Sequence, residues 1–393
     1  MNSFEYSGNT DRRRVYAEVD VAALDFNIAS IRKRLPRGTA LTAVVKADAY
    51  GHGAAGIALH LEESDAVSHF AVATAEEAFS LRDAGVKKPI LLLGYTFPES
   101  FERIVLEGIR PAVFRADTLA EYAQAVEAIR ASGDIGREDC VHIHIAVDCG
   151  MRRIGVTPDE AGLDFVRQAA ATQGIHVEGI FTHFAKADEA DLSDARDACQ
   201  TFSAFVKQAE AIVPGKKLIT HAANSAAIMV LEEAHLDLVR AGIILYGLYP
   251  SDEVDKDALA VRPVLSLKSS IVFVKEVAAG CGISYGGTYV TSDKTRVATV
   301  SAGYADGIPR TLSGKGEVLV RGQRVPILGR VCMDQFMIDV TNVPDVTAGD
   351  TVTIIGRDGS EEITMEEVAA LSGRFHYELP CLIPPRVPRL LKQ

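Results

Sequence analysis

The amino-acid sequence predicts an α/β protein in which a (β/α)8 barrel of the TIM type is followed by a smaller, mainly β C-terminal domain. Eight short apolar runs, typical of buried strands, recur between Leu41 and Val239, and helix-like stretches separate nearly all of them. After Pro250, runs rich in valine, isoleucine and threonine alternate with glycine, aspartate and proline turns. The length of 393 residues exceeds one ordinary domain, and an apolar fraction of 48% suffices for a large core.

The strand-like and helix-like segments of the first part alternate as in a barrel of about 250 residues. An open doubly wound sheet is the alternative arrangement. A possible strand at 15–19 precedes the eight. The expected strands are 41–45, 70–73, 90–93, 111–114, 141–147, 177–183, 218–221 and 236–239, and the expected helices include 54–61, 75–84, 118–129, 158–171, 192–211 and 226–233.

The second part begins after a charged segment that ends in proline and is typical of a linker. We expect residues 1–13 to be loose, 14–250 to form the barrel, 251–262 to link the domains and 263–393 to form the β domain. The expected strands there are 269–277, 296–301, 317–320, 324–327, 336–340 and 350–355, with one helix at 364–371.

Composition excludes several classes of function. The net charge of −12 is spread along the chain without a basic stripe, which argues against a nucleic-acid surface. No apolar run approaches the roughly 20 residues of a membrane helix, and the N-terminus lacks a signal-peptide core. The six cysteines form no C-x-x-C pair, which favours reduced thiols in the cytoplasm over disulfides or a zinc framework.

The stretch LTAVVKADAYGHG carries the first candidate for chemistry, Lys46, at the end of the first barrel strand. A lysine partly withdrawn from water there has a lowered pKa and suits Schiff-base chemistry. Two other interpretations remain at this point. The side chain can simply extend to water, and Gly51, Gly53 and Gly56 spell the G-x-G-x-x-G pattern of dinucleotide-binding loops.

Polar residues recur where the later strands end, which is where the active site of such a barrel lies. They are Asp148 and Arg153 after the fifth strand, His183 at the sixth, Asn224 and Ser225 after the seventh, and Arg240 and Gly242 after the eighth. Loops after strands seven and eight often hold a phosphate, although Asn224 or Ser225 can equally be a helix cap. A lysine facing a phosphate site indicates a phosphorylated aldehyde cofactor, of which pyridoxal phosphate is the obvious one.

A metal site is the competing interpretation. His142 and His144 lie on one face of the fifth strand, with His183 and His221 as further possible ligands. The H-x-H pair comes early in its strand, however, toward the barrel end away from the expected site. We therefore expect no metal, and we also expect no dinucleotide, because a reactive lysine has no place in that fingerprint.

Nine motifs in order resemble the alanine racemase family of pyridoxal-phosphate barrels over nearly the whole chain. They are AVVKADAYGHG, GMRRIG, THFA, HAANSA, VRAGIILYG, GISYGGTY, GYADG, GRVCMDQ and YELPC. The resemblance implies interconversion of L- and D-alanine for peptidoglycan synthesis by a cytoplasmic homodimer. Racemisation removes a proton from one face of a flat carbanion and returns one to the other, so two bases suffice.

The resemblance also implies a role for each matching residue. Lys46 holds the cofactor as an internal aldimine and is one base, while Tyr285 is the second base and comes from the partner subunit. Arg153 binds the substrate carboxylate, together with the backbone of Met333 from the partner. The implied cofactor contacts are Tyr50, Ser225, Gly242, Ile243 and Tyr377 at the phosphate, His183 stacked on the ring, Arg240 at the ring nitrogen and Asn224 in support, with Tyr304 and Asp334 as further supporting residues.

Two features refine this expectation. Many members of the family carry a lysine seven residues before the carboxylate-binding arginine, and the carbamate of this lysine orients the arginine. In this sequence the corresponding residue is Ala146, so we expect no carbamate. Tyr377 is expected to limit the substrate side chain to about a methyl group. The alternatives are a barrel-type pyridoxal-phosphate decarboxylase, for which Arg240 is unsuitable, and a non-catalytic carrier of the cofactor, which would lack the β domain and Tyr285.

Overall fold

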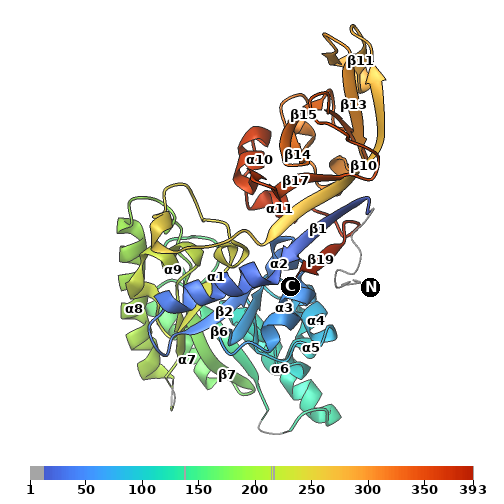
Figure 1. Cartoon of the computed structure of the whole chain (residues 1–393). Helices are drawn as coiled ribbons and strands as arrows, with labels where there is room; N and C mark the ends of the chain where they lie inside the picture. The colour runs from blue at the N-terminus through green and yellow to red at the C-terminus, as the bar shows by residue number, and fades with distance from the viewer. Residues whose placement is uncertain (1–12, 137–138, 214, 216, 393) are drawn as a thin grey trace. The chain divides into compact units, whose positions relative to one another are not determined.

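The computed structural model describes residues 13–136, 139–213, 215 and 217–392 (Figure 1). The chain divides into two compact units, which we describe separately. The barrel unit comprises Asp25–Ala49 and Ile57–Arg262, and the β unit comprises Met1–Leu24, Tyr50–Gly56 and Pro263–Gln393. The sequence predicts that residues 1–13 are loose, and all of them except Arg13 lie outside the described part of the chain. The carbonyl of Arg13 accepts a hydrogen bond from Ser270 Oγ at 2.7 Å.

The barrel unit is built on eight parallel strands in the order β8-β7-β6-β5-β4-β3-β2-β9. The two ends of this order meet, because Asp237 N donates to Thr220 O at 3.1 Å and Arg240 N donates to Ala223 O at 3.0 Å. The predicted (β/α)8 barrel is therefore confirmed, and the open sheet is excluded. The strands are β2 (Ala40–Val44), β3 (His69–Val72), β4 (Ile90–Leu92), β5 (Arg110–Val113), β6 (Val141–Ala146), β7 (Ile175–Phe181), β8 (Ile219–His221) and β9 (Leu238–Ala241).

Helices cover the outside of these strands (Figure 1). Their apolar residues recur every three to four positions, as in α8, where Cys199, Phe202, Val206 and Ala209 are buried. Helix α1 (Val21–Arg34) runs from the β unit into the barrel unit. The others are α3 (Ala54–Glu62), α4 (Ala75–Asp83), α5 (Phe101–Leu106), α6 (Ala116–Ser132), α7 (Glu160–Ala171), α8 (Ser193–Ile212) and α9 (Ser225–Val230).

The β unit contains a nine-stranded sheet in the order β18-β17-β14-β15-β16-β13-β10-β1-β19 and a two-stranded ribbon, β11-β12. The mainly β domain expected from the sequence is present, with α10 (Met365–Ser372) and α11 (Glu378–Cys381). The strands are β1 (Val15–Asp20), β10 (Leu265–Val277), β11 (Gly282–Ile283), β12 (Tyr289–Val290), β13 (Thr295–Val300), β14 (Glu317–Val320), β15 (Gln323–Leu328), β16 (Phe336–Asp339), β17 (Thr351–Asp358), β18 (Glu361–Ile363) and β19 (Arg389–Lys392).

One expected boundary is wrong. The sequence places residues from 14 onward in the barrel, but β1 pairs antiparallel with β10 and parallel with β19 inside the sheet of the β unit. An alternating apolar pattern predicts that a strand exists and which face is buried, but it does not identify the partner strand. The N-terminal strand therefore belongs with residues more than two hundred positions away in the sequence.

The glycines of the G-x-G-x-x-G pattern have structural roles. Gly51 and Gly53 have φ angles of 79° and 93°, which favour glycine, and Gly56 lies inside α3. A Cβ atom on Gly51 would lie 1.8 Å from the carbonyl oxygen of Pro380, so only glycine fits there. The pattern thus reflects a tight turn and close backbone packing, and the dinucleotide interpretation is dropped.

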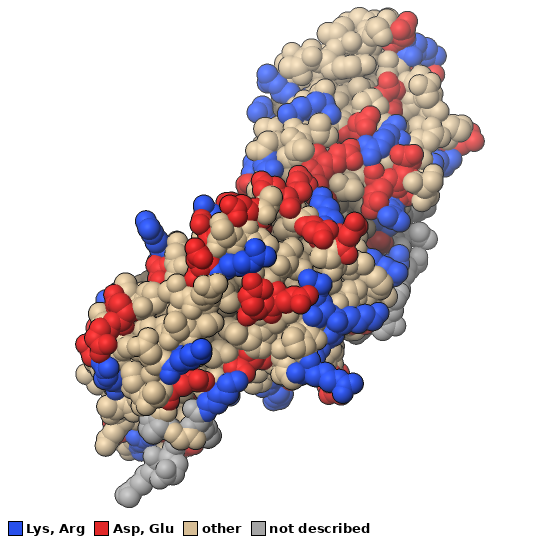
Figure 2. Space-filling model, turned by 90° about the vertical axis from the view of Figure 1, so that its left-hand side faces the viewer, with Lys and Arg blue, Asp and Glu red and all other residues tan. Residues whose placement is uncertain are grey.

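The surface agrees with the composition. On the face shown in Figure 2, lysine and arginine side chains are interspersed with aspartate and glutamate. Within the described ranges, no helix is both long and apolar enough to cross a membrane. The same part of the chain holds no group of three or more His, Cys, Asp or Glu side chains suited to a metal ion.

Candidate active site

Lys46 lies two residues beyond the end of β2 and opens an unusual turn, labelled α2 (Lys46–Tyr50). Ala47, Asp48 and Ala49 have φ angles of 51–55° and ψ angles of 46–51°, and Tyr50 has a φ of 52°. Four consecutive non-glycine residues are therefore left-handed, at a cost of about 1–2 kcal/mol each. This turn fixes the direction in which the backbone leaves the strand next to Lys46.

Hydrogen bonds from the neighbouring strand and helix hold the turn. Ala49 N donates to Val45 O at 2.9 Å, and Ala47 N donates to Glu77 Oε1 at 2.6 Å. The other oxygen of Glu77 accepts from the backbone of Ala73 and Thr74 at the start of α4. Glu77 therefore connects the left-handed turn to a capped helix start, a role that the sequence did not reveal.

The strain in this turn predicts an effect on stability. Ala47 is exposed and left-handed, so Ala47→Gly should raise the free energy of unfolding by about 0.5–1 kcal/mol, because relief of strain exceeds the extra flexibility of glycine. Ala120→Gly, at an exposed right-handed position in α6, should lower it by about 1 kcal/mol. Urea unfolding of both variants measures the difference. A loss of stability in Ala47→Gly equal to that in Ala120→Gly would contradict the assigned strain.

A cavity of about 260 Å³ opens in the barrel unit beside Lys46. Polar side chains from the ends of several strands line it, as expected for this fold. The lining residues are Lys46, Ala73, Leu93, Gly94, Ala146, Val147, Asp148, Met151, Arg153, Ile154, Phe181, Thr182, His183 and Arg240. The structure thus brings together five residues that the sequence singled out, namely Lys46, Asp148, Arg153, His183 and Arg240.

Arg153 is held on a loop but is not paired. Asp148 Oδ1 accepts the backbone N–H groups of Gly150 at 3.0 Å and Arg152 at 2.9 Å, which orders the loop that carries Arg153. Within the described residues, the guanidinium of Arg153 makes no hydrogen bond or ion pair, and the position of the family's lysine is the buried Ala146. An unpaired arginine lining a cavity is suited to binding a carboxylate.

Arg240 is buried, and its guanidinium begins a row of side chains that are joined by successive hydrogen bonds. Its NH1 lies 2.9 Å from Nδ1 of His221, and Nε2 of His221 lies 2.8 Å from Nδ1 of His144. Because a guanidinium can only donate, Nδ1 of His221 must accept, so each histidine carries its proton on Nε2 and donates onward. The chain ends at Glu178, whose Oε2 lies 3.3 Å from Nε2 of His144.

The pKa values agree with this chain. Burial lowers the pKa of His144 and of His221, so both rings are neutral. Burial also lowers the pKa of Arg240 to about 9, and the nearby charge of Arg153 adds to this effect. Burial alone would raise the pKa of Glu178, but hydrogen bonds from His142 and His144 hold it well below its ordinary value. The H-x-H pair considered as a metal site is thus part of the support for Arg240.

His183, unlike His144 and His221, lines the cavity itself. Burial lowers its pKa to about 3, and the charges of Arg240, Arg153 and Lys46 contribute in the same direction. NH2 of Arg240 lies 3.3 Å from His183 Nδ1 and donates to Thr182 O at 2.8 Å. His183 is therefore a neutral ring at the cavity wall.

The same physics predicts how stability depends on pH. Burial lowers the pKa of His69 from 6.5 to about 4. Below pH 6.5 the unfolded chain binds a proton at this residue that the folded chain does not, so the free energy of unfolding falls by about 1.4 kcal/mol per pH unit down to pH 4. Urea unfolding between pH 8 and pH 4 should show a smaller fall in His69→Asn. Parallel curves for the two proteins over that range would contradict the shift.

A set of donors suited to phosphate lies where α9 and the 3-10 helix η3 (Ile243–Tyr246) begin. Asn224 Oδ1 caps α9 by accepting Ala227 N at 3.0 Å, and Gly242 N donates to Ser225 Oγ at 2.9 Å. Ser225 therefore keeps its hydroxyl hydrogen for another acceptor. The buried N–H of Ile243 has no hydrogen-bond acceptor among the described residues. These groups fit the phosphate of the expected cofactor.

The other predicted site residues lie in the β unit. The rings of Tyr50 and Tyr377 meet edge to face, with centroids 6.3 Å apart. Tyr285 is 70% exposed and Met333 is 53% exposed. Both line a groove of about 720 Å³, together with Ser284, Gly286, Cys332, Asp334, Gln335 and Met337.

Family models cover almost the whole chain. The model of the alanine racemase N-terminal domain matches residues 19–250, and that of the alanine racemase C-terminal domain matches residues 264–391. The chain belongs to the alanine racemase family.

Individual members of the alanine racemase family match over nearly their full length. The alanine racemase of Desulforamulus reducens is 44% identical over 96% of this chain and 98% of its own, and that of Desulfovibrio desulfuricans is 43% identical over the same shares. The solved alanine racemase of Clostridium difficile 630 is 37% identical, with a TM-score of 0.90 over 97% of this chain and 96% of its own. Both units of the fold are therefore those of the family.

Proposed function

We propose that this protein interconverts L-alanine and D-alanine with pyridoxal 5'-phosphate held covalently at Lys46. The observation that carries the proposal is the single cavity in which Lys46 faces an unpaired Arg153, a neutral His183 and the buried Arg240. The hydroxyl of Ser225 and the N–H of Ile243 are assigned to the cofactor phosphate, as are Tyr50 and Tyr377. Asn224 and Gly242 support them, because the Gly242 N–H donates to Ser225 Oγ. Pyridoxal phosphate, when bound, supplies an electron sink that makes the α-proton of alanine acidic.

The remaining chemistry belongs to side chains. Arg153 binds the substrate carboxylate and so fixes the orientation of the α-carbon. The amine of Lys46 takes or returns the α-proton on one face, and the phenol of Tyr285 does so on the other. Arg240, assigned to the ring nitrogen, can only donate and leaves that nitrogen without a proton. This weakens the electron sink and disfavours transamination.

The active form is proposed to be a homodimer in which Tyr285 and Met333 complete the site of the partner. The support is the exposure of both residues in the groove of the β unit. Phe273 and Val290 of the same unit are exposed as well, and large exposed apolar side chains favour burial against another molecule. Sedimentation of the purified protein at micromolar concentration should give twice the mass of the 42.2 kDa chain.

A bound anion such as chloride, or a water molecule, is proposed to orient Arg153 in place of a carbamate, since Ala146 cannot carry one. Replacing gluconate by chloride at constant ionic strength should lower the KM for alanine about twofold to tenfold through electrostatic contact with Arg153. The intact mass of the protein should show no carbamate. A KM independent of the anion would exclude the anion and leave water as the group that orients Arg153, whereas a modified lysine beside Arg153 would contradict the proposal.

Tyr377 is proposed to restrict the substrate side chain. Its ring stacks on Phe375, with centroids 4.6 Å apart, and meets Tyr50 at its edge, so its position is well supported. Alanine is therefore preferred over larger amino acids. The D-alanine produced is proposed to serve peptidoglycan synthesis in the cytoplasm.

The deciding experiment follows the optical activity of L-alanine and of D-alanine with the purified protein and added pyridoxal phosphate. The expected result is decay of both to the same racemic mixture, with solvent deuterium entering the α-position. Release of carbon dioxide would indicate the decarboxylase, for which Arg240 is unsuitable. Binding of the cofactor without exchange would indicate the non-catalytic carrier.

A further inference from the structure

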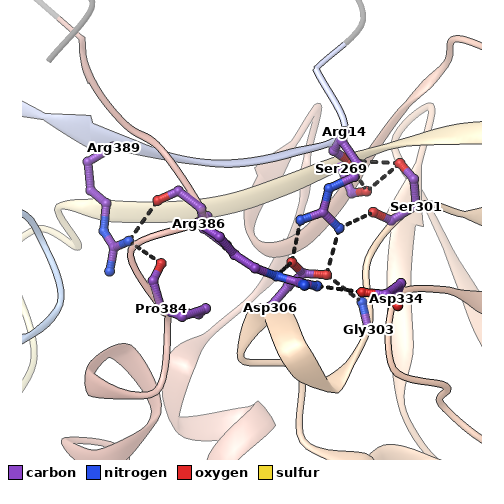
Figure 3. A network of polar contacts seen from close by, with 10 residues as sticks. Arg14, Ser269, Ser301, Gly303, Asp306, Asp334, Pro384, Arg386 and Arg389 are labelled. Carbon is purple, nitrogen blue, oxygen red and sulfur yellow. Dashed lines mark hydrogen bonds and ion pairs between the residues drawn. The ribbon is translucent and has the colours of Figure 1, made fainter. Parts of the chain in front are cut away.

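The carboxylate of Asp306 is fully buried and joins the two ends of the described chain (Figure 3). Arg14, just before β1, donates NH1 to Oδ2 at 2.9 Å and NH2 to Oδ1 at 2.5 Å. Arg386, just before β19, donates Nε to Oδ1 at 2.8 Å. Burial alone would raise the pKa of Asp306, but the hydrogen bonds from Arg14 and Arg386 hold it below its ordinary value. The carboxylate is therefore ionised at neutral pH.

Asp306 also closes a tight turn, labelled η6 (Tyr304–Asp306), by accepting the N–H of Gly303 at 2.9 Å. This turn holds a second segment of the β unit. Tyr304 N donates to Cys332 O at 3.0 Å, and Ala305 N donates to Met333 O at 2.9 Å. A Cβ atom on Gly303 would lie 2.3 Å from Met333 O, so the approach of the two segments leaves no room for a side chain.

The direction of one peptide group follows from these bonds. The C=O of Cys332 and the N–H of Met333 belong to the same planar trans peptide, in which they point in opposite directions. Because Tyr304 holds the C=O, the N–H of Met333 must point away from the turn. Among the described residues this N–H has no acceptor, and Met333 lines the same groove as Tyr285.

Arg386 holds the segment from its other end. Its NH2 donates to Asp334 Oδ1 at 2.7 Å while its Nε remains on Asp306 (Figure 3). Two sets of hydrogen bonds thus connect the segment Cys332, Met333 and Asp334 to the buried carboxylate of Asp306. One set passes through the turn and the other through Arg386.

We propose that Asp306 is a positioning residue that aims the Met333 N–H, as a donor for the substrate carboxylate, into the site of the facing subunit. This inference rests on the proposed function, because it requires the groove around Tyr285 to meet a partner's site. Asp306 itself does not touch the substrate. Its charge fixes the two arginines and the turn, and these fix the peptide group.

The test compares Asp306→Asn and Asp334→Asn with the wild-type enzyme. Loss of the Asp306 charge should raise the KM for alanine and the inhibition constant of acetate, a carboxylate that cannot react, by at least about tenfold, as expected for a charge-assisted hydrogen bond. The kcat should change less than threefold, and the visible absorbance of the bound cofactor should stay the same. Asp334→Asn breaks only one of the two sets of hydrogen bonds and should give a smaller rise of both constants.

Asp339→Asn is the matched control. Asp339, at the end of β16, accepts hydrogen bonds from Thr341. Among the described residues it accepts none from the Met333 segment, so its loss should leave the acetate constant unchanged. If Asp306→Asn does not fold, Asp334→Asn, at an exposed position, decides the matter alone. An active wild-type enzyme with unchanged constants in these variants would overturn the positioning role, whereas an inactive wild-type protein would overturn the proposed function itself.

Discussion

Lys46→Ala will abolish racemisation and the visible absorbance of covalently held pyridoxal phosphate. Without its amine the protein loses both the attachment point of the cofactor and one of the two proton carriers. Loss of general base catalysis alone costs about 10²–10⁴ in rate, and loss of the covalent link adds to it. The measurement is optical rotation of alanine together with an absorbance spectrum after dialysis.

The matched control for this variant is Lys217→Ala. Lys217 lies at the surface of the barrel unit in an ion pair with Asp237, so its removal should leave both the spectrum and the rate unchanged. A dialysed Lys46→Ala protein that retains the absorbance band would place the cofactor on another lysine. Retained racemisation would remove Lys46 from the mechanism.

Tyr285→Phe will lower racemisation by about 10²–10⁴, the usual contribution of a positioned acid or base. The loss of proton exchange should affect only one of the two alanine enantiomers, because each base acts on one face of the α-carbon. Entry of solvent deuterium into one alanine enantiomer should persist through Lys46, while entry into the other should be lost. Tyr289→Phe, at the neighbouring tyrosine on β12, is the control and should exchange both enantiomers.

The same variant tests whether Tyr285 acts on the partner's site. In a mixed dimer of Lys46→Ala and Tyr285→Phe subunits, one site combines both defects and the other combines an intact Lys46 with an intact Tyr285. Random reassociation of the two inactive proteins gives half mixed dimers and should therefore restore about a quarter of the wild-type activity for two independent sites. No restoration would place Tyr285 in the site of its own chain.

The barrel could be predicted from the sequence because each of its strands carries its own signal. The expected strands 41–45, 177–183 and 218–221 became β2, β7 and β8, with both ends within two residues of the expected positions. The candidate site followed from position alone, since polar residues after such strands meet at one end of a barrel. Lys46, Arg153, His183 and Arg240 line one cavity for that reason.

Three features could not be predicted from the sequence, namely the turn after Lys46, the contact of His144 with His221 and the role of Asp306, and each has its own physical reason. The left-handed turn after Lys46 contradicts the intrinsic preference of its two alanines and of Tyr50, so no local rule indicates it. The H-x-H spacing of His142 and His144 is compatible with a metal site, and nothing in the sequence indicates that the ring of His144 lies against that of His221 instead. Asp306 lies in the GYADG motif, but its role could not be predicted, because its arginine partners lie 292 and 80 residues away in the sequence.

The arrangement of β1 has a consequence for how the chain is made. The β unit takes its strands from both ends of the sequence, and β1 lies between β10 and β19. During synthesis β1 leaves the ribosome before the other strands, but it cannot pair with β19 until the last residues of β19 have been made. By then all eight strands of the barrel have already been synthesised. A fragment that starts at Pro263 would expose the edges of β10 and β19, so the β unit should be produced only as part of the whole chain.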